Sequence, residues 1–270
     1  MAPPLSRLDH VIIAVRNLDV AAASYRRLGF TLTPRGLHGG RGTGNHCIMF
    51  KDSYIELLGI VGDAGAKGRL AERVAAQGEG GMGIAYGAAD AYAAASALRA
   101  AGIAAEDPTD LSRPVDLDGK REIVKFRNVM MPGLTLPNVM QFVCTHLTPE
   151  LTRARHEWQL HPNSATGIVE VVVTADDIDQ YWSEMETLFD NTASNVAVSL
   201  AARRNMEVHY GTALNGALHA GIVMLRIFVN ELDAISAMLE MAKVPHHEGA
   251  DVVVVPASAA HGVVIEFAEG

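Results

Sequence analysis

The sequence predicts an α+β protein built from four β-α-β-β-β units in series, paired into two curved half-barrel sheets. Two observations favour this fold. Strand-like runs rich in β-branched residues recur along the chain, and each is followed by a helix-like segment and further short strands. Such a small open sheet cannot bury both of its faces alone, whereas two units packed together bury them and leave a concavity in each pair.

The first unit begins with a strand on which His10, Ile12 and Ala14 share one face, because side chains alternate along a strand. Asn17 is a typical helix N-cap and Gly29 a typical residue after a helix end, so they bracket a helix. A glycine-rich loop and a short turn separate the later strands. We expect strands at 8–15, 30–33, 46–50 and 54–60, a helix at 20–28, the loop at 36–44 and the turn at 51–53.

Three further units repeat this order less regularly. The second has an alanine-rich helix and a Pro-Gly turn, and the third opens on a valine-rich strand. We expect strands at 82–87, 121–131 and 138–146 with a helix at 90–101; strands at 167–173, 195–201 and 206–210 with a helix at 178–189; and strands at 222–229, 251–255 and 262–267 with a helix at 232–243.

The segment 148–165 is polar and contains prolines, which is typical of a connector that packs over the surface. We therefore expect an N-terminal pair of units at 1–147, a linker at 148–165 and a C-terminal pair of units at 166–270. The active site is expected in the N-terminal pair.

Composition narrows the classes of function. The formal net charge is −9 and no basic stripe is visible, so we expect a small-molecule substrate and no nucleic acid. No apolar run approaches the roughly 18 residues of a membrane span. Two cysteines, Cys47 and Cys144, do not make a disulfide framework, which favours buried thiols in a cytoplasmic protein. A homodimer is compatible with the sequence.

His10 and Glu56 are the candidate site residues of the first unit. Glu56 interrupts an otherwise apolar strand, and a buried carboxylate without a partner is costly. A metal ion shared with His10 would remove that cost. The alternatives are a histidine satisfied within the core and a glutamate that faces solvent on an edge strand.

The repeat suggests which residues occupy the same positions elsewhere. In the second unit, Met82 aligns with His10 and Gln141 aligns with Glu56. The amide oxygen of Gln141 is therefore a candidate neutral third ligand, although a hydrogen bond to a neighbouring strand explains it equally well.

In the third unit Glu170 aligns with His10; in the fourth, Met224 aligns with His10 and Glu266 with Glu56. Glu266 is the alternative third ligand if the first unit pairs with the fourth. We prefer pairing with the second unit, and hence Gln141, because consecutive elements are usually neighbours.

Four β-α-β-β-β units with a histidine on the first strand and a glutamate on the last resemble the vicinal oxygen chelate superfamily. Leu8-Asp9-His10-Val11, Gly42 to Asn45 and Tyr54 to Leu57 look like its glyoxalase-like branch, and 161–167 resembles that branch's link between halves. The segment 256–267 is similar to the last strand of methylmalonyl-CoA epimerases and glyoxalases. The resemblance implies a fold of the glyoxalase, bleomycin-resistance and dioxygenase type.

The resemblance also implies a divalent metal bound by His10 and Glu56, with open positions for two vicinal substrate oxygens. Fe, Mn, Zn, Ni and Mg are not distinguished. Met82 and Met224 depart from the usual second histidine. His10 with two oxygen ligands resembles a facial triad.

Three residues are candidate substrate contacts. Arg41 in the glycine-rich loop could bind a carboxylate or oxyanion, His46 could act as ligand or acid/base, and Tyr54 could line the cavity. For His46, a solvent-facing or hydrogen-bonded position is the competing interpretation, and for Tyr54 a core position.

The preferred function is a metal-dependent lyase or isomerase that stabilises an enediolate of a small oxo- or hydroxy-carbonyl compound, with His10 and Glu56 as catalytic residues. One alternative is an Fe(II) extradiol-type dioxygenase acting on an aromatic substrate. The other is a non-catalytic protein of the same fold that binds an apolar small molecule without a metal.

Overall fold

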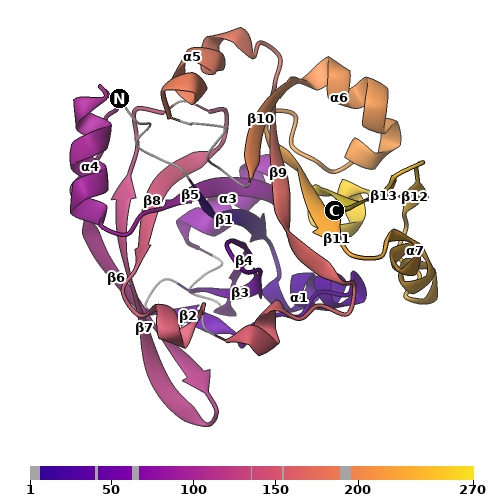
Figure 1. The fold of residues 1–270 in the computed structure, drawn as a ribbon, viewed down its shortest axis with the longest axis horizontal. Coiled ribbons are helices and arrows are strands. Elements are labelled where there is room, and N and C mark those ends of the chain that lie inside the picture. The colour runs from indigo at the N-terminus through magenta and orange to yellow at the C-terminus, as the bar shows by residue number, and fades with distance from the viewer. Residues whose placement is uncertain (1–6, 40–41, 63–66, 135, 154, 189–195) are drawn as a thin grey trace.

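The computed structural model describes residues 7–39, 42–62, 67–134, 136–153, 155–188 and 196–270. Its strands form an eight-stranded and a six-stranded sheet, each covered by helices on one face. The predicted α+β fold of curved sheets is confirmed (Figure 1). No helix in these ranges is long and apolar enough to cross a membrane.

The eight-stranded sheet joins the first two units side by side. Its order is β2-β3-β4-β1-β5-β8-β7-β6, with β1 parallel to β4 and antiparallel to β5. The predicted pairing of the first unit with the second is therefore confirmed. The strands are β1 Leu8–Val15, β2 Gly36–His38, β3 Thr43–Met49, β4 Tyr54–Ile60, β5 Gly80–Gly87, β6 Thr109–Leu117, β7 Lys120–Met130 and β8 Met140–His146.

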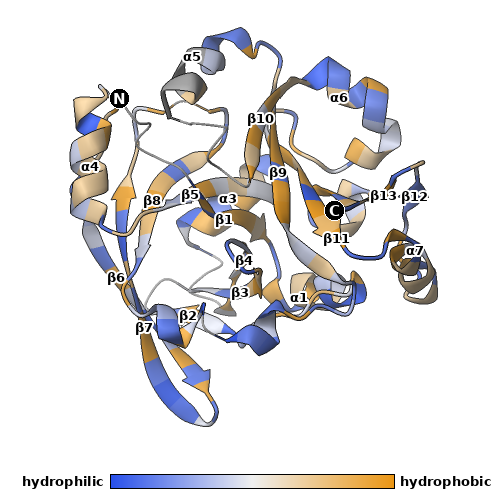
Figure 2. Cartoon of the chain, viewed as in Figure 1, coloured by the Kyte–Doolittle hydropathy of each residue, from blue (hydrophilic) through white to orange (hydrophobic). Residues whose placement is uncertain are grey.

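This sheet curls until its edge strands β2 and β6 touch, so it forms a nearly closed barrel. Helices α1 (Leu18–Arg27) and α4 (Ala91–Ala100) pack on its outer face. Asn17 and Asp90 cap them, because each side chain accepts hydrogen bonds from two backbone N–H groups of the first turn. The β6–β7 hairpin projects from the body, and Figure 2 shows that its tip is hydrophilic.

An unpredicted helix closes one end of the barrel. Helix α3 (Arg69–Gln77) buries Leu70 and Val74 against Ala14 of β1 and the partly buried Met82 of β5. The 148–165 segment carries the short 3₁₀ helices η1 (Pro149–Leu151) and η2 (His156–Gln159), whose side chains pack over the other end. Both ends of the barrel are therefore covered by other elements, while its cavity stays half open to solvent.

The six-stranded sheet has the order β10-β9-β11-β14-β13-β12. It carries helices on one side, and its third unit is shortened. The elements are β9 Ala165–Ala175, α5 Asp179–Leu188, β10 Ala197–Ala202, α6 Arg203–Tyr210, η3 Gly211–Leu214, β11 Gly221–Val229, α7 Leu232–Met241, β12 His247–Glu248, β13 Val252–Val255, η4 Ala257–Ala259 and β14 Val264–Glu269.

Two of the predicted strands are wrong. Residues 206–210 lie in α6, because β10 already pairs in parallel with β9 and the chain then packs Met206 against Val172 and Val223. Residues 30–33 form no strand: Phe30 instead stacks against Phe267 of the second sheet at 5.9 Å. Strand β2 begins later, inside the predicted glycine-rich loop.

The two sheets share one apolar core. It holds Ile84 of β5 and Ile222 of β11, and the Tyr25 hydroxyl on α1 donates across it to the Ala260 carbonyl at 3.0 Å. A Cβ added at Gly81 would lie 2.3 Å from the Ile222 Cβ. The close approach of β5 to β11 thus depends on a missing side chain.

We expect Gly81→Ala to lower the free energy of unfolding by ~1–3 kcal/mol, because the methyl group must push β5 away from β11. Urea unfolding followed by circular dichroism measures this. The matched control is Gly167→Ala on β9, where an added Cβ meets nothing within 4 Å. Equal stability of the two variants would contradict the packing described here.

Candidate active site

The barrel encloses a cavity of about 470 Å³. Much of its wall is apolar, and its polar residues come from both halves of the first sheet. A smaller neighbouring cavity of about 20 Å³ has room for little more than a water molecule. The polar residues that line the larger cavity include His10, His38, Thr43, Asn45, Tyr54, Glu56, Ser112, Arg113 and Asn128.

His10 and Glu56 meet in this cavity. The parallel pairing of β1 with β4 sets Ile12 beside Glu56 and His10 beside Tyr54. The His10 Nε2 atom lies 3.6 Å from Glu56 Oε2. The imidazole stacks on the Tyr54 ring, with centroids 4.4 Å apart, and meets the edge of Phe142. Two aromatic rings therefore fix its plane.

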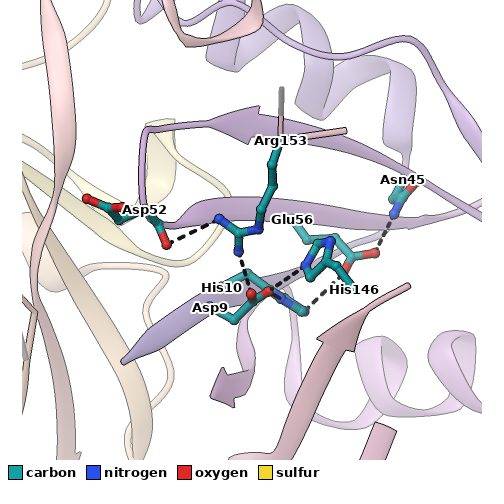
Figure 3. A network of polar contacts seen from close by, with 7 residues as sticks. All are labelled: Asp9, His10, Asn45, Asp52, Glu56, His146 and Arg153. Atoms are coloured by element: carbon teal, nitrogen blue, oxygen red, sulfur yellow. Dashed lines mark hydrogen bonds and ion pairs between the residues drawn. The ribbon is translucent and has the colours of Figure 1, made fainter. Parts of the chain in front are cut away.

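Asp9 orients the same imidazole from behind. The β1–β5 ladder skips Asp9 between Leu8 and His10, and such a bulge redirects a side chain. The fully buried carboxylate accepts from His10 Nδ1 at 2.8 Å and from His146 Nε2 at 3.1 Å, and it pairs with Arg153 (Figure 3). Burial raises the pKa of Asp9, but the hydrogen bonds and charges of His10 and His146 outweigh it and hold the pKa well below its usual range.

The hydrogen bond to Asp9 determines which His10 nitrogen faces the cavity without a proton. With Nδ1 donating to a carboxylate, a neutral imidazole presents the Nε2 lone pair. That lone pair faces Glu56 Oε2, which is also an acceptor. Two acceptors this close are favourable only when a proton or a cation lies between them.

Asn45 holds the other oxygen of Glu56. Its Nδ2 donates to Glu56 Oε1 at 2.6 Å, which leaves Oε2 for the contact with His10. The Asn45 Oδ1 atom is buried and has no hydrogen-bond partner in the part of the chain that is described.

These donors fit a divalent ion with few protein ligands. Neighbouring ligand atoms on an ion with bonds of about 2.1 Å lie roughly 3 Å apart, so small shifts of His10 and Glu56 would suffice. Across the ladder, His10 pairs with Ala85, which offers no ligand atom. An ion held by His10 and Glu56 would keep its other positions for water or substrate oxygens.

The prediction of Gln141 as third ligand is wrong. Its neighbours Met140 and Phe142 line the cavity, whereas its Oε1 accepts from the Tyr86 hydroxyl at 2.7 Å in the core. It pairs with Ile84 as Glu56 pairs with Ile12, so the aligned register is right. A register shift between β1 and β5 reverses the face, because one residue of slip turns every side chain over.

Glu266, the alternative third ligand, lies in the other sheet. Its Oε1 accepts from Arg226 Nε at 2.5 Å and its Oε2 from the Tyr210 hydroxyl at 2.7 Å. Arg226 also pairs with Glu170 at 2.7 Å. A guanidinium thus already neutralises Glu266, and the glutamate is not available to His10.

The predicted substrate contacts fare differently. Tyr54 lines the cavity and stacks on His10. His46 lies on the other face of β3, where its Nδ1 contacts the Thr33 carbonyl oxygen at 2.8 Å and burial lowers its pKa, so its prediction as a substrate contact is wrong. Arg41 lies outside the described residues.

The two methionines that align with His10 are apolar side chains in the cavity wall and in the core. Met82 packs against Ile12 beside the cavity, and Met224 is buried within the second sheet. Neither position supplies a second histidine.

Asp9, Cys144 and His146 form a second group of candidate metal ligands, with donor atoms within 4.8 Å of one another. Asp9 is already neutralised by Arg153, and burial raises the pKa of the Cys144 thiol, which would have to ionise to bind. This group suits a metal less well than His10 and Glu56.

Several functional residues were missed from the sequence. Asp9 adjoins His10 and could have been noticed there, and Asn45 is a lone amide in a strand beside Cys47. His146 and Arg153 come to Asp9 from 137 and 144 residues away, so no local pattern marks them. The other missed cavity residues are His38, Arg113 and Asn128.

A family model described as a glyoxalase-like domain matches residues 8–189. A hypothetical protein from Staphylococcus aureus has 14% sequence identity and a TM-score of 0.69, covering 98% of this chain and 99% of its own. Methylmalonyl-CoA epimerases from Streptomyces coelicolor (24% identity, TM-score 0.41, 53% of this chain and 99% of its own) and Mycobacterium tuberculosis (20%, 0.41, 54% and 91%) are also similar. No curated protein matches the chain.

Replacing Arg153, whose guanidinium pairs with Asp9, tests the buried network of hydrogen bonds and ion pairs around Asp9. We expect Arg153→Met to lower the free energy of unfolding by ~3–5 kcal/mol, because it leaves a buried carboxylate without its guanidinium. Arg155→Met, which breaks pairs with the exposed Asp118 and Glu157, should change it far less, because solvent screens these pairs. Equal, small losses in both variants in urea unfolding would count against a buried Asp9 ion pair.

Proposed function

Because the chain belongs to the glyoxalase-like domain family, we propose that it is a metal-dependent isomerase or lyase acting on a small oxo- or hydroxy-carbonyl compound. The single observation that carries this proposal is the contact between two acceptors, His10 Nε2 and Glu56 Oε2, on the wall of the barrel cavity. The substrate would lie within the barrel, with its reacting atoms at this pair.

When bound by His10 and Glu56, a divalent ion supplies Lewis-acid polarisation of a carbonyl with an adjacent oxygen. The protein residues do the rest. Asp9, Tyr54 and Phe142 hold the imidazole in place, and Asn45 fixes one oxygen of Glu56. Asn45 leaves Oε2 as the one exchangeable oxygen of Glu56, so Oε2 would be either a ligand of the ion or, when released from it, the base that accepts a proton from the carbon beside the carbonyl.

A second candidate function is binding of an apolar small molecule without chemistry. The wall opposite the pair favours it, because Met130, Met140 and Phe142 line that side and Ala85 stands across from His10. A dioxygenase needs a second histidine ligand, and the position aligned with His10 in the same barrel holds Met82, which disfavours that alternative. Metal content separates the remaining two candidates.

We expect the wild-type protein to bind about one divalent ion per chain after incubation with excess metal and desalting, measured by inductively coupled plasma mass spectrometry. His10→Ala and Glu56→Gln should each lose most of this metal, because each removes one of two protein ligands. Glu266→Gln is the matched control, since this glutamate has the corresponding place in the other sheet and should leave metal content unchanged. Unaltered metal in both site variants would refute the site.

Proton transfer is tested by deuterium exchange. In D₂O, the metal-loaded protein should catalyse exchange of the proton beside the carbonyl in members of a panel of small 2-hydroxy ketones and 2-oxo acids, followed by NMR. Glu56→Gln should slow exchange by at least roughly 10²–10⁴-fold, because it loses the base together with a ligand of the ion, and excess metal should not restore the rate. Chelation should abolish the reaction and added metal restore it. Exchange that survives in Glu56→Gln would exclude Glu56 as the base.

A further inference from the structure

Arg113 is a half-buried cation on the wall of the same cavity. It lies on β6, and its guanidinium carbon stands 5.9 Å from the centroid of the Phe126 ring on β7, which also lines the cavity. Its side chain therefore faces the interior of the barrel, from the half of the sheet opposite His10.

Gly36 makes room for this guanidinium. A Cβ at residue 36 would lie 2.1 Å from Arg113 Nη1 and 2.4 Å from Asn45 Oδ1. The φ angle of Gly36 is not in the left-handed region, so the backbone does not require glycine there. Glycine is needed there for space, because it lets the Arg113 side chain pass over β2 where β2 and β6 meet.

Among the described residues, the Phe126 ring is the neighbour of the Arg113 guanidinium, and no carboxylate pairs with it. Other arginines pair with carboxylates, as Arg153 does with Asp9 and Arg226 with Glu266. Within the described residues, no hydrogen bond or ion pair engages Arg113, although the group carries five N–H donors. The N–H groups of such a half-buried guanidinium donate to water or to a ligand.

Arg113 and Glu56 act on the same region of the cavity wall. Burial raises the pKa of the Cys47 thiol to about 12, and the negative charge of Glu56 adds to this effect while the positive charge of Arg113 opposes it. Gly36 pairs with Asn45, and Asn45 bonds Glu56, so the guanidinium lies over β2, two strands from β4. An added Cβ at residue 36 would touch both Arg113 Nη1 and Asn45 Oδ1, so the guanidinium lies next to the Asn45 amide and that amide separates it from Glu56.

We propose that Arg113 binds a carboxylate of the ligand, on the far side of the Asn45 amide from the atoms held by His10 and Glu56. Planar guanidinium and carboxylate groups match in a bidentate pair, which is a strong form of hydrogen bonding. The separation selects a compound with vicinal oxygens at one end and a carboxylate several carbons away. The assignment of substrate class rests on the proposed function, whereas carboxylate binding by Arg113 does not require the metal.

Two matched probes test the proposal: 2-oxoadipate and its 6-methyl ester, which differ only in the charge of the distal end. Isothermal titration calorimetry of the full-length protein should show the acid binding roughly 10- to 100-fold more tightly than the ester. Arg113→Gln should remove this preference by weakening the acid alone, and Arg113→Lys should retain part of it. Arg127→Gln is the control, because Arg127 pairs with Asp110 and does not line the cavity.

Gly36→Ala tests the same contact with the arginine kept, because its methyl group displaces the guanidinium; we expect a reduced preference for the acid. Wild-type protein that binds neither probe, or both equally, overturns the proposal, as does an undiminished preference in Arg113→Gln. Repeating the titration after chelation separates the two proposals. If the preference for the acid persists after chelation, carboxylate binding by Arg113 is supported even where the metal-content experiment contradicts the proposed function.

Discussion

The arrangement of the candidate site depends on the buried carboxylate of Asp9. It bonds His10, which shares its strand, and reaches His146 on β8 and Arg153 in the segment after the barrel. One group thereby fixes the imidazole tautomer, ties the two halves of the first sheet together and anchors the segment that covers the barrel end (Figure 3). A buried charge demands such partners, because desolvation without them costs several kcal/mol.

The second sheet neutralises its strand-four glutamate with a side chain of its own. Arg226 sits between Glu170 and Glu266 and neutralises both. In the first sheet the corresponding glutamate, Glu56, has a histidine and an amide beside it and no guanidinium within ion-pairing distance among the described residues. In the second sheet Arg226 therefore balances the glutamate charges, whereas in the first sheet the charge of Glu56 has no guanidinium among the described residues to balance it.

The fold and the His10–Glu56 pair could be predicted because each depends on local pattern: strand alternation, helix caps and a carboxylate in an apolar strand. Gln141 could not be assigned correctly, because a register shift that the sequence does not mark turns it into the core. Helix α3 and the α6 segment follow from packing against distant residues. Arg113 reaches the cavity only because the sheet curls β6 onto β2, far apart in the chain.

The ion pair between Asp9 and Arg153 also sets an order of assembly during synthesis. Every strand of the first sheet has left the ribosome once residue 146 has, yet Arg153 follows later and lies 144 positions from its partner. A nascent chain that stops at 147 holds every strand of the barrel, with Asp9 bonded to His10 and His146 but without its guanidinium. Any stretch that keeps this ion pair must therefore extend past the last strand, into the connecting segment.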